Sequence, residues 1–201
     1  MSSTQAVPPL SLNTATVREQ WNLQQMIEAC ARHGIPGISP WRDKLTELGA
    51  ARAASMIRAN GLTVTGLCRG GMFPALDAAG RRAAIDDNLR AIDDAATIGA
   101  RCLVLVAGGL PSGSRDLPGA REMVRDGIAS VLDHARAAGV PLAIEPLHPM
   151  YAADRCCVNT LAQALDLCDQ IDPDGVRPRT DGGRAALGVA VDEGHRPAAG
   201  P

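Results

Sequence analysis

The chain has 201 residues, of which 46% are hydrophobic and 21% are charged, as in an ordinary globular protein with one sizeable core. The 20 basic and 22 acidic residues give a formal net charge of -2, so charge provides no reason to expect a nucleic acid partner. The amino terminus has no basic stretch followed by an apolar one, and no segment approaches the ~20 apolar residues of a membrane span. We therefore expect a cytoplasmic protein without a membrane partner.

The clearest repeated pattern is a helical stretch that ends in glycine and is followed by a short apolar run. Gly34, Gly61, Gly99 and Gly139 occupy the glycine position, which is typical of helix C-terminal caps. The apolar runs are rich in Val, Ile and Leu without strict alternation, as expected for parallel strands covered on both faces. The predicted strands are residues 10–13, 35–39, 63–67, 102–106, 142–144 and 187–191.

The segments between these strands have apolar faces at helical spacing, so we expect an α/β fold with a parallel sheet and right-handed crossovers. The spacing fits either an open doubly wound sheet or part of an eight-stranded barrel. The first strand-helix turn lacks the G-x-G-x-x-G of dinucleotide-binding open sheets, which favours the barrel. The predicted inward-facing residues are Ile85, Leu89, Ile92 and Ala96, then Val124, Ile128, Leu132 and Ala135, then Leu161, Leu165, Cys168 and Ile171.

One domain is expected to cover residues 1–201. After Ile171 the composition changes to Asp, Gly, Arg and Pro, so residues 172–186 are predicted to be a flexible insert. Residues 193–201 have neither a helical face nor a strand run and are predicted to be a disordered tail. A closed eight-stranded barrel usually needs about 250 residues, so a barrel here would be truncated after about six strands.

In parallel barrels the working residues lie at the carboxyl ends of the strands and in the loops that follow. The strongest signal is Glu145, which an apolar strand delivers just before Pro146, and Asp192 repeats the arrangement one strand later. Two such carboxylates suit Mg²⁺ or Mn²⁺, and with histidine also Zn²⁺ or Co²⁺. The alternative is that these acids cap helices or pair with arginines. The other polar residues at predicted strand ends are Asn13, Trp41 with Arg42, Arg69 in CRGGMF, and His148.

The aromatic residues Trp21, Trp41, Phe73 and Tyr151 all follow predicted strands, which suggests an aromatic rim suited to a sugar or small polyol. The alternative is that they only pack loops. The six cysteines show no Cys-x-x-Cys spacing and are interpreted as small buried thiols rather than a zinc site or disulfides.

The segment AIEPLHPMYAADRCCVNTLAQALDLCD, followed by LGVAVD, resembles the xylose-isomerase-like sugar phosphate isomerase/epimerase family. SLNTATV, GIPGISPWRDKL, GLTVTGLCRGGMF and ARCLVLVAGGLP also resemble strand-end segments of that family. The resemblance implies a (β/α)₈ barrel and a divalent metal held by Glu145 and Asp192, with two further ligands that have no counterpart here. It also implies that His195 contacts the substrate. Asn13, Trp41, Arg69 and His148 are expected to contact it as well, because they follow predicted strands.

The implied reaction is isomerisation or epimerisation, in which Glu145 moves a proton beside a carbonyl while the metal binds two substrate oxygens. A lyase of the same fold would begin with the same proton abstraction. The alternative of another class is a non-catalytic barrel remnant that binds weakly or self-associates through an uncovered sheet edge. An abasic-site endonuclease, which shares the fold, is disfavoured by the nearly neutral charge.

Overall fold

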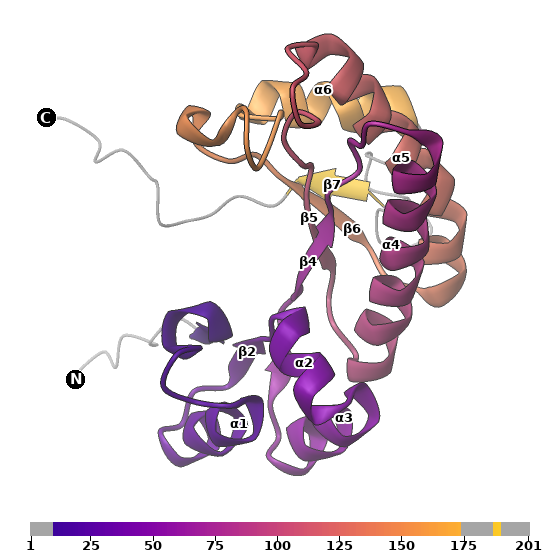
Figure 1. The fold of residues 1–201 in the computed structure, drawn as a ribbon. Helices are drawn as coiled ribbons and strands as arrows, with labels where there is room; N and C mark the ends of the chain where they lie inside the picture. Colours follow the sequence, from indigo (N-terminus) through magenta and orange to yellow (C-terminus); the bar gives the residue numbers. More distant parts are fainter. Residues whose placement is uncertain (1–9, 174–186, 190–201) are drawn as a thin grey trace, which may run out of the picture. The chain divides into compact units, whose positions relative to one another are not determined.

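A computed structural model describes residues 10–173 and 187–189 of the chain. Its strands form two sheets, ordered β1-β2-β3 and β4-β5-β6-β7 (Figure 1). Each of the pairs β1–β2, β2–β3, β5–β6 and β6–β7 is parallel, as predicted. The strands are β1 (Ser11–Asn13), β2 (Gly37–Ser39), β3 (Thr63–Val64), β4 (Leu67–Gly71), β5 (Leu103–Val106), β6 (Leu142–Glu145) and β7 (Leu187–Val189).

The strand predicted over residues 63–67 is divided, and this prediction was wrong in its extent. β3 ends at Val64 and pairs with β2, whereas Leu67 begins β4, which belongs to the other sheet. Thr65 N–H still donates to the Ile38 carbonyl at 2.9 Å, but Leu67 N–H donates to the Cys102 carbonyl at 2.9 Å. The backbone changes its hydrogen-bonding partner between these residues, and short-range patterning cannot show such a change.

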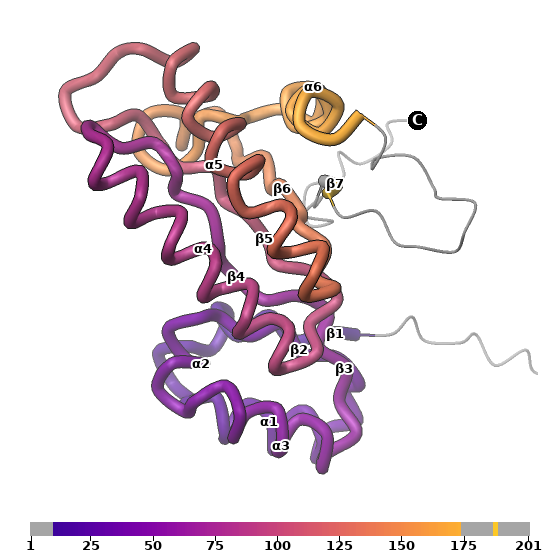
Figure 2. The backbone as a smooth tube through the Cα atoms, turned by 90° about the vertical axis from the view of Figure 1, so that its right-hand side faces the viewer, coloured from indigo at the N-terminus to yellow at the C-terminus, as the bar shows by residue number. Residues whose placement is uncertain are grey.

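The chain divides into two compact units. The first comprises Met1–Cys68 and Asp94–Cys102, and the second comprises Arg69–Asp93 and Leu103–Pro201. In the first unit, α1 and α3 contact each other and α2, and α3 also contacts β3 (Figure 2). The elements of this unit outside its sheet are η1 (Thr14–Val17), α1 (Leu23–Arg32), α2 (Arg42–Leu48) and α3 (Ala50–Ala59).

Helix α1 illustrates how the sequence forms these elements. Asn22 accepts a hydrogen bond from Gln25 N–H at 2.9 Å, and the Gln25 side chain accepts one from Asn22 N–H at 3.0 Å, which completes a capping box. The apolar face of the helix buries Met26, Ile27 and Cys30 completely. At the other end Gly34 has a φ of 66°, so the predicted glycine cap is confirmed.

In the second unit, α4 and α5 lie side by side along the sheet, where His134 Nε2 and Asp93 Oδ1 are 2.7 Å apart (Figures 1 and 2). Helix α6 contacts both α5 and β7. The elements outside this sheet are α4 (Ala78–Ile98), of which the part up to Asp93 belongs to this unit, α5 (Leu117–Ala138), η2 (Pro149–Tyr151) and α6 (Leu161–Ile171).

The predicted helix faces are confirmed for α5 and only partly for the other two helices. All four predicted residues of α5 are buried. In α4 the predicted Ala96 is exposed, because the buried face is rotated toward Ala91, Ala95 and the polar residue Asn88. In α6 the predicted Cys168 is buried, but the predicted Leu161 and Leu165 are 50% and 42% exposed. Ala164 and Leu167 are buried in their place.

The cysteines and one aromatic residue differ in how well they were predicted. All six thiols are unbonded to one another, and five are buried, as expected.

Phe73, predicted on an exposed rim, is instead only 2% exposed. It fills the space beside Gly127 of α5, where any side chain would collide with the phenyl ring, so Phe73 belongs to the core. Within the described residues, no helix is both long and apolar enough to cross a membrane.

Candidate functional site

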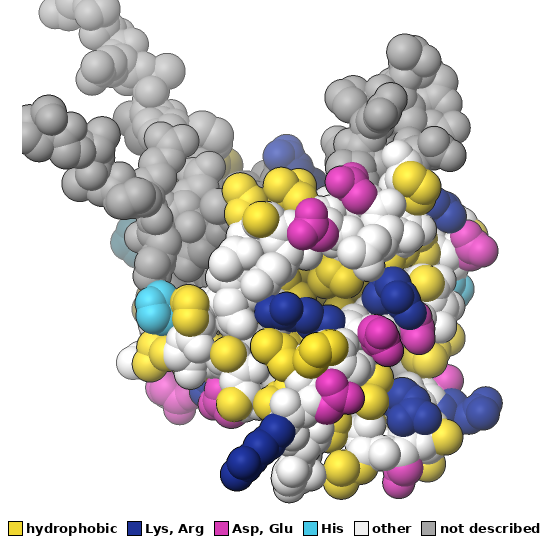
Figure 3. All heavy atoms as spheres, turned by 90° about the horizontal axis from the view of Figure 1, so that it is seen from above, with side chains coloured by type: hydrophobic (Ala, Val, Ile, Leu, Met, Phe, Trp, Pro, Cys, Tyr) yellow, Lys and Arg dark blue, Asp and Glu magenta, His cyan; other side chains and the backbone are white. Residues whose placement is uncertain are grey.

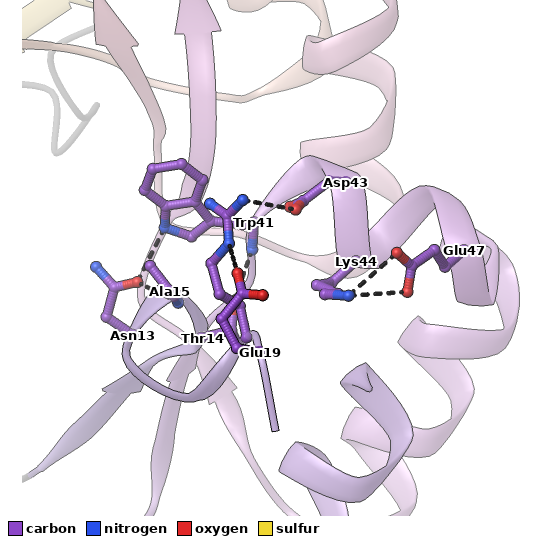
Figure 4. Close-up of polar contacts among 9 residues, drawn as sticks. Asn13, Thr14, Ala15, Glu19, Trp41, Asp43, Lys44 and Glu47 are labelled. Atoms are coloured by element: carbon purple, nitrogen blue, oxygen red, sulfur yellow. Dashed lines mark hydrogen bonds and ion pairs between the residues drawn. The ribbon is translucent and has the colours of Figure 1, made fainter. Parts of the chain in front are cut away.

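The carboxyl ends of β1 and β2 bring two predicted site residues together. The Trp41 indole Nε1 donates to Asn13 Oδ1 at 2.9 Å (Figure 4). The same Asn13 oxygen accepts a hydrogen bond from Ala15 N–H at 3.0 Å, which caps η1. Below the indole, Trp41 N–H donates to the hydroxyl of the fully buried Thr14 at 2.9 Å. The orientation of Trp41 is thus fixed through both its backbone and its ring.

Charged side chains surround this tryptophan. The Arg18 guanidinium lies 5.7 Å from the ring centroid of Trp41, within the range of a cation–π interaction. Arg18 also pairs with Glu19 at 3.2 Å and approaches Asp43 at 4.0 Å (Figure 4). These ion pairs are largely exposed, so each contributes little to stability. The arrangement combines a flat, half-buried aromatic surface with a ring of polar groups.

The end of β4 in the second unit is held differently. Asn88 of α4 is completely buried, and its side chain binds both backbone groups of Gly71. Asn88 Oδ1 accepts from Gly71 N–H at 2.6 Å, and Asn88 Nδ2 donates to the Gly71 carbonyl at 2.8 Å. The same amide also donates to the Ala84 carbonyl at 2.9 Å. A buried amide with all these partners stabilises one backbone conformation and disfavours others.

The backbone held by Asn88 contains an unusual residue. Gly71 has a φ of 97°, and Met72 follows with a φ of 59°, which non-glycine residues rarely adopt. Met72 N–H donates to the Val106 carbonyl at 2.8 Å, so the bend remains joined to β5. A Cβ atom at Gly71 would collide with the Val106 carbonyl oxygen, which excludes any other residue there. The predicted site residue Arg69, on the same strand, is exposed, and its Nη1 lies 3.4 Å from Met72 Sδ.

Glu145 is the last residue of β6, as the sequence predicted, and is neither fully buried nor fully exposed. The loop after it is fixed by Asn159, whose side-chain amide donates to the carbonyls of Leu147 at 3.0 Å and Cys156 at 2.9 Å. The exposed His148 caps η2, since its Nδ1 accepts from Met150 N–H at 3.2 Å. Its Nε2 is the ring nitrogen that this cap does not use.

The loop also contains an adjacent pair of buried thiols, Cys156 and Cys157. Burial, with a smaller contribution from the neighbouring Cys156, raises the pKa of Cys157 to about 11. The Cys157 carbonyl accepts a hydrogen bond from Arg121 Nε at 2.9 Å, which ties the loop to α5. A buried thiol with a raised pKa, such as that of Cys157, is unsuited to nucleophilic chemistry. Both loop cysteines are buried, as predicted.

A divalent metal requires several ligands. The described residues contain no group of three or more His, Cys, Asp or Glu side chains able to hold a metal ion. The predicted metal ligand Asp192 and the predicted substrate contact His195 lie outside the described residues. Most of the predicted insert 172–186 and all of the predicted tail 193–201 also lie outside them. Glu145 is therefore the one predicted ligand whose position is described.

A separate groove of about 280 Å³ lies between α5 and α6. Its polar lining mixes both signs of charge, and it is formed mainly by helix residues rather than by strand ends. On the face seen in Figure 3, the described basic and acidic side chains are likewise interspersed rather than gathered by sign. The groove residues are Arg121, Glu122, Arg125, Val158, Gln163, Asp166, Leu167 and Gln170.

Sequence reasoning did not find Asn88, Met72 or Asn159. A signal was present for Asn88, because it interrupts the apolar face of α4 three residues after Ile85. A polar side chain on a buried face needs a specific partner, which here is the Gly71 backbone. No local pattern indicates that Met72 has a positive φ, since the conformation follows from the contacts of its neighbours.

The strand-end residues lie on parallel strands that alternate with helices, and the profile of the xylose isomerase-like TIM barrel family matches residues 27–184. The chain belongs to this family. Membership agrees with the predicted fold class, a parallel α/β barrel type. Among curated protein sequences, none matches this chain.

Several solved structures are similar to this chain along most of its length. Protein SMc04130 from Sinorhizobium meliloti 1021 is 58% identical with a TM-score of 0.83, and the match covers 91% of this chain. The chain spans 62% of that protein's length. IolI protein with a bound zinc atom is 24% identical with a TM-score of 0.72, over 90% of this chain and 61% of IolI.

A third similar structure is D-psicose 3-epimerase in the presence of D-fructose. It is 19% identical with a TM-score of 0.70, over 90% of this chain and 62% of the epimerase. At this identity the likeness shows a shared fold. The family match and these likenesses thus place the strand-end residues of the chain on the fold of a xylose isomerase-like barrel.

Proposed function

We propose that this chain is part of a divalent-metal-dependent isomerase or epimerase that acts on a sugar or a related hydroxy-carbonyl compound. The observation that carries the proposal is Glu145, a partly exposed carboxylate at the carboxyl end of β6 in a parallel sheet. Membership of the xylose isomerase-like family supports it, because catalytic residues of (β/α) barrels come from strand ends. Two similar structures are named as an epimerase and as a zinc-bound protein.

In the proposed reaction, Glu145 removes the proton from the carbon beside the substrate carbonyl. The electron pair of the broken C–H bond moves toward the carbonyl oxygen, and an enediol-type intermediate results. Return of a proton to the former carbonyl carbon, with transfer of the hydroxyl proton to the former carbonyl oxygen, gives an isomer. Return of a proton to the original carbon from the opposite face gives an epimer. His148, three residues after Glu145, is proposed to hydrogen-bond a substrate hydroxyl through Nε2, since its Nδ1 is engaged in the η2 cap.

A divalent metal would polarise the substrate oxygens and make this proton more acidic. The described residues supply one of its proposed ligands, Glu145, and Asp192 is proposed as another. One carboxylate alone does not form a metal site, so a bound metal would require further ligands.

The remaining predicted contacts are proposed to bind substrate. Trp41 offers a flat apolar surface whose orientation is fixed by Asn13, and such surfaces suit the carbon face of a sugar. Arg69 offers guanidinium donors for hydroxyl or anionic oxygens. His195 is proposed as a further contact.

Calorimetric titration of the metal-stripped protein with Mn²⁺ tests the proposal, with circular dichroism to establish folding. We expect saturable binding by the wild type, loss of binding in Glu145→Gln and retention in Glu122→Gln, an exposed carboxylate on α5. A folded wild type that binds no Mn²⁺, or equal binding by both variants, would contradict the proposal. Proton transfer is tested separately, as deuterium uptake from D₂O into D-fructose.

A second candidate is a non-catalytic protein that associates with another copy of itself. The observation in its favour is the exposure of Leu161 and Leu165, one turn apart on α6, at 50% and 42%. Light scattering should then show a mass that rises with concentration in the wild type and stays constant in Leu161→Gln/Leu165→Gln. A wild type of constant monomeric mass would exclude this candidate.

A further inference from the structure

Met72 is the one non-glycine residue with a positive φ among residues 10–173 and 187–189. Glycine or asparagine would adopt this conformation with less strain, whereas a long unbranched side chain brings no local advantage. Strained residues persist where the surrounding structure determines them, and they concentrate at functional sites. The presence of methionine at this position therefore requires a reason beyond the turn itself.

The residues on both sides of Met72 are firmly held. Gly71 is bound by the buried Asn88 side chain at 2.6 and 2.8 Å. Phe73 is 2% exposed, and its N–H donates to the Ala107 carbonyl at 3.1 Å. Gly108 allows the close approach, since a Cβ there would meet Met72 Cα at 3.0 Å. The backbone of Met72 thus has no freedom to relax toward a negative φ.

The side chain of Met72 does not join its neighbours in the core. The residue is 39% exposed at the carboxyl end of β4, and its sulfur lies 3.4 Å from Arg69 Nη1. The fixed backbone and the exposed side chain of Met72 together place a polarisable apolar group beside the hydrogen-bond donors of Arg69. A sugar presents the matching chemistry, namely C–H surface next to hydroxyl groups.

We infer that Met72, held in the left-handed conformation by Asn88, is a specificity-determining residue that contacts the carbon face of a sugar-like substrate. This inference rests on the proposed function. Asn88 acts as a positioning residue, because it reaches the site only through the backbone of Gly71.

The test compares three variants. Met72→Gly keeps the backbone, because glycine adopts a positive φ without strain, and removes the side chain. Met72→Leu keeps an apolar group of similar size. Leu76→Gly removes an apolar side chain that is 71% exposed in the loop beyond Phe73, and serves as the matched control. Affinity for D-fructose is measured by calorimetry in the presence of Mn²⁺, and thermal unfolding is measured for each variant.

We expect Met72→Gly to unfold at the same temperature as the wild type or a higher one, yet to bind D-fructose about tenfold more weakly. Met72→Leu and Leu76→Gly should bind it within about twofold of the wild type. If Met72 had only a structural role, Met72→Gly would show the opposite result, namely unchanged affinity for D-fructose with a lowered unfolding temperature.

The outcomes separate this inference from the proposed function. Wild-type binding of both Mn²⁺ and D-fructose, with equal sugar affinity in Met72→Gly, overturns the role of Met72 and leaves the proposed function standing. Wild-type binding of Mn²⁺ without D-fructose also overturns the inference, since the substrate face would not be that of a sugar. A folded wild type that binds neither overturns the proposed function and the inference together.

Discussion

The two units hold their strand ends by different means. In the first unit, Asn13 and Trp41 are joined by a hydrogen bond between side chains that are at least partly accessible to solvent. In the second, the end of β4 is held by a fully buried Asn88 that binds the backbone of Gly71. An exposed hydrogen bond exchanges with water at little cost, whereas a buried one leaves unsatisfied groups when it is broken. The first arrangement can therefore adjust to a ligand, and the second fixes its geometry before any ligand arrives.

The largest expected effect is that of Gly71→Ala. The new Cβ would collide with the Val106 carbonyl oxygen and would also need a φ of 97°, so we expect a loss of about 3 kcal/mol or more in unfolding free energy. Gly113→Ala is the matched control, because Gly113 has a φ of 78° with open space around its Cβ. It should lose only about 1 kcal/mol, as measured by urea unfolding. Equal losses in the two variants would mean that the close approach of the Val106 carbonyl of β5 to Gly71 does not contribute to the loss of stability.

Asn88→Ala should have the next largest effect. It leaves both backbone groups of Gly71 without their buried partner, so we expect a loss of about 2–3 kcal/mol. The control is Asn60→Ala in the first unit, where an exposed side chain donates to the Met56 carbonyl at 2.9 Å and should matter by less than about 0.5 kcal/mol. Similar losses of unfolding free energy in the two variants, measured by urea unfolding, would contradict the proposed difference between buried and exposed side-chain hydrogen bonds.

The buried thiols predict a specific dependence on pH. The pKa values of Cys157 and Cys168 are each raised to about 11, chiefly by burial, from an ordinary value of 9.0. The folded state therefore binds their protons more tightly than the unfolded state. Their contribution to stability is complete below pH 9 and is lost as the pH rises from 9 to 11, by about 1–2 kcal/mol per thiol.

This dependence is measured by urea unfolding at pH 8 and pH 10.5. The double variant Cys157→Ala/Cys168→Ala should be less stable at both values but should lose less stability between them than the wild type. The same loss in both proteins would show that groups other than these two thiols account for the whole pH effect.

Asn13→Ala should have the smallest effect on stability, below about 1 kcal/mol, because its hydrogen bonds are exposed. It should nevertheless change the environment of Trp41, since the indole Nε1 loses its partner. Fluorescence in a Trp21→Phe background reports on Trp41 alone, and a red-shifted emission is expected. An unchanged spectrum would mean that Asn13 does not orient the indole.

The sequence predicted the succession of strands and helices well because each element carries its own periodic pattern and glycine cap. It was least accurate where burial is decided by neighbours distant in the chain. Leu161 and Leu165 were expected inside on spacing alone, but α6 turns Ala164 and Leu167 toward α5 and β7. Phe73 was expected on the rim because it follows a predicted strand. It is buried instead, because its ring packs against Gly127, which has no side chain.

The same distinction between local patterns and distant contacts applies to the candidate site. The sequence by itself determined that Asn13, Trp41, Glu145 and His148 come at or just beyond the ends of strands, because strand limits follow from local composition. Arg69 was also expected beyond a strand end, but it lies in the middle of β4, because the strand predicted to end at residue 67 is divided. Only the tertiary structure decided that Asn13 binds Trp41 and that Asn88 bends the chain at Gly71 and Met72. Those contacts join residues 17 to 28 positions apart, so they depend on packing and not on any pattern within one element.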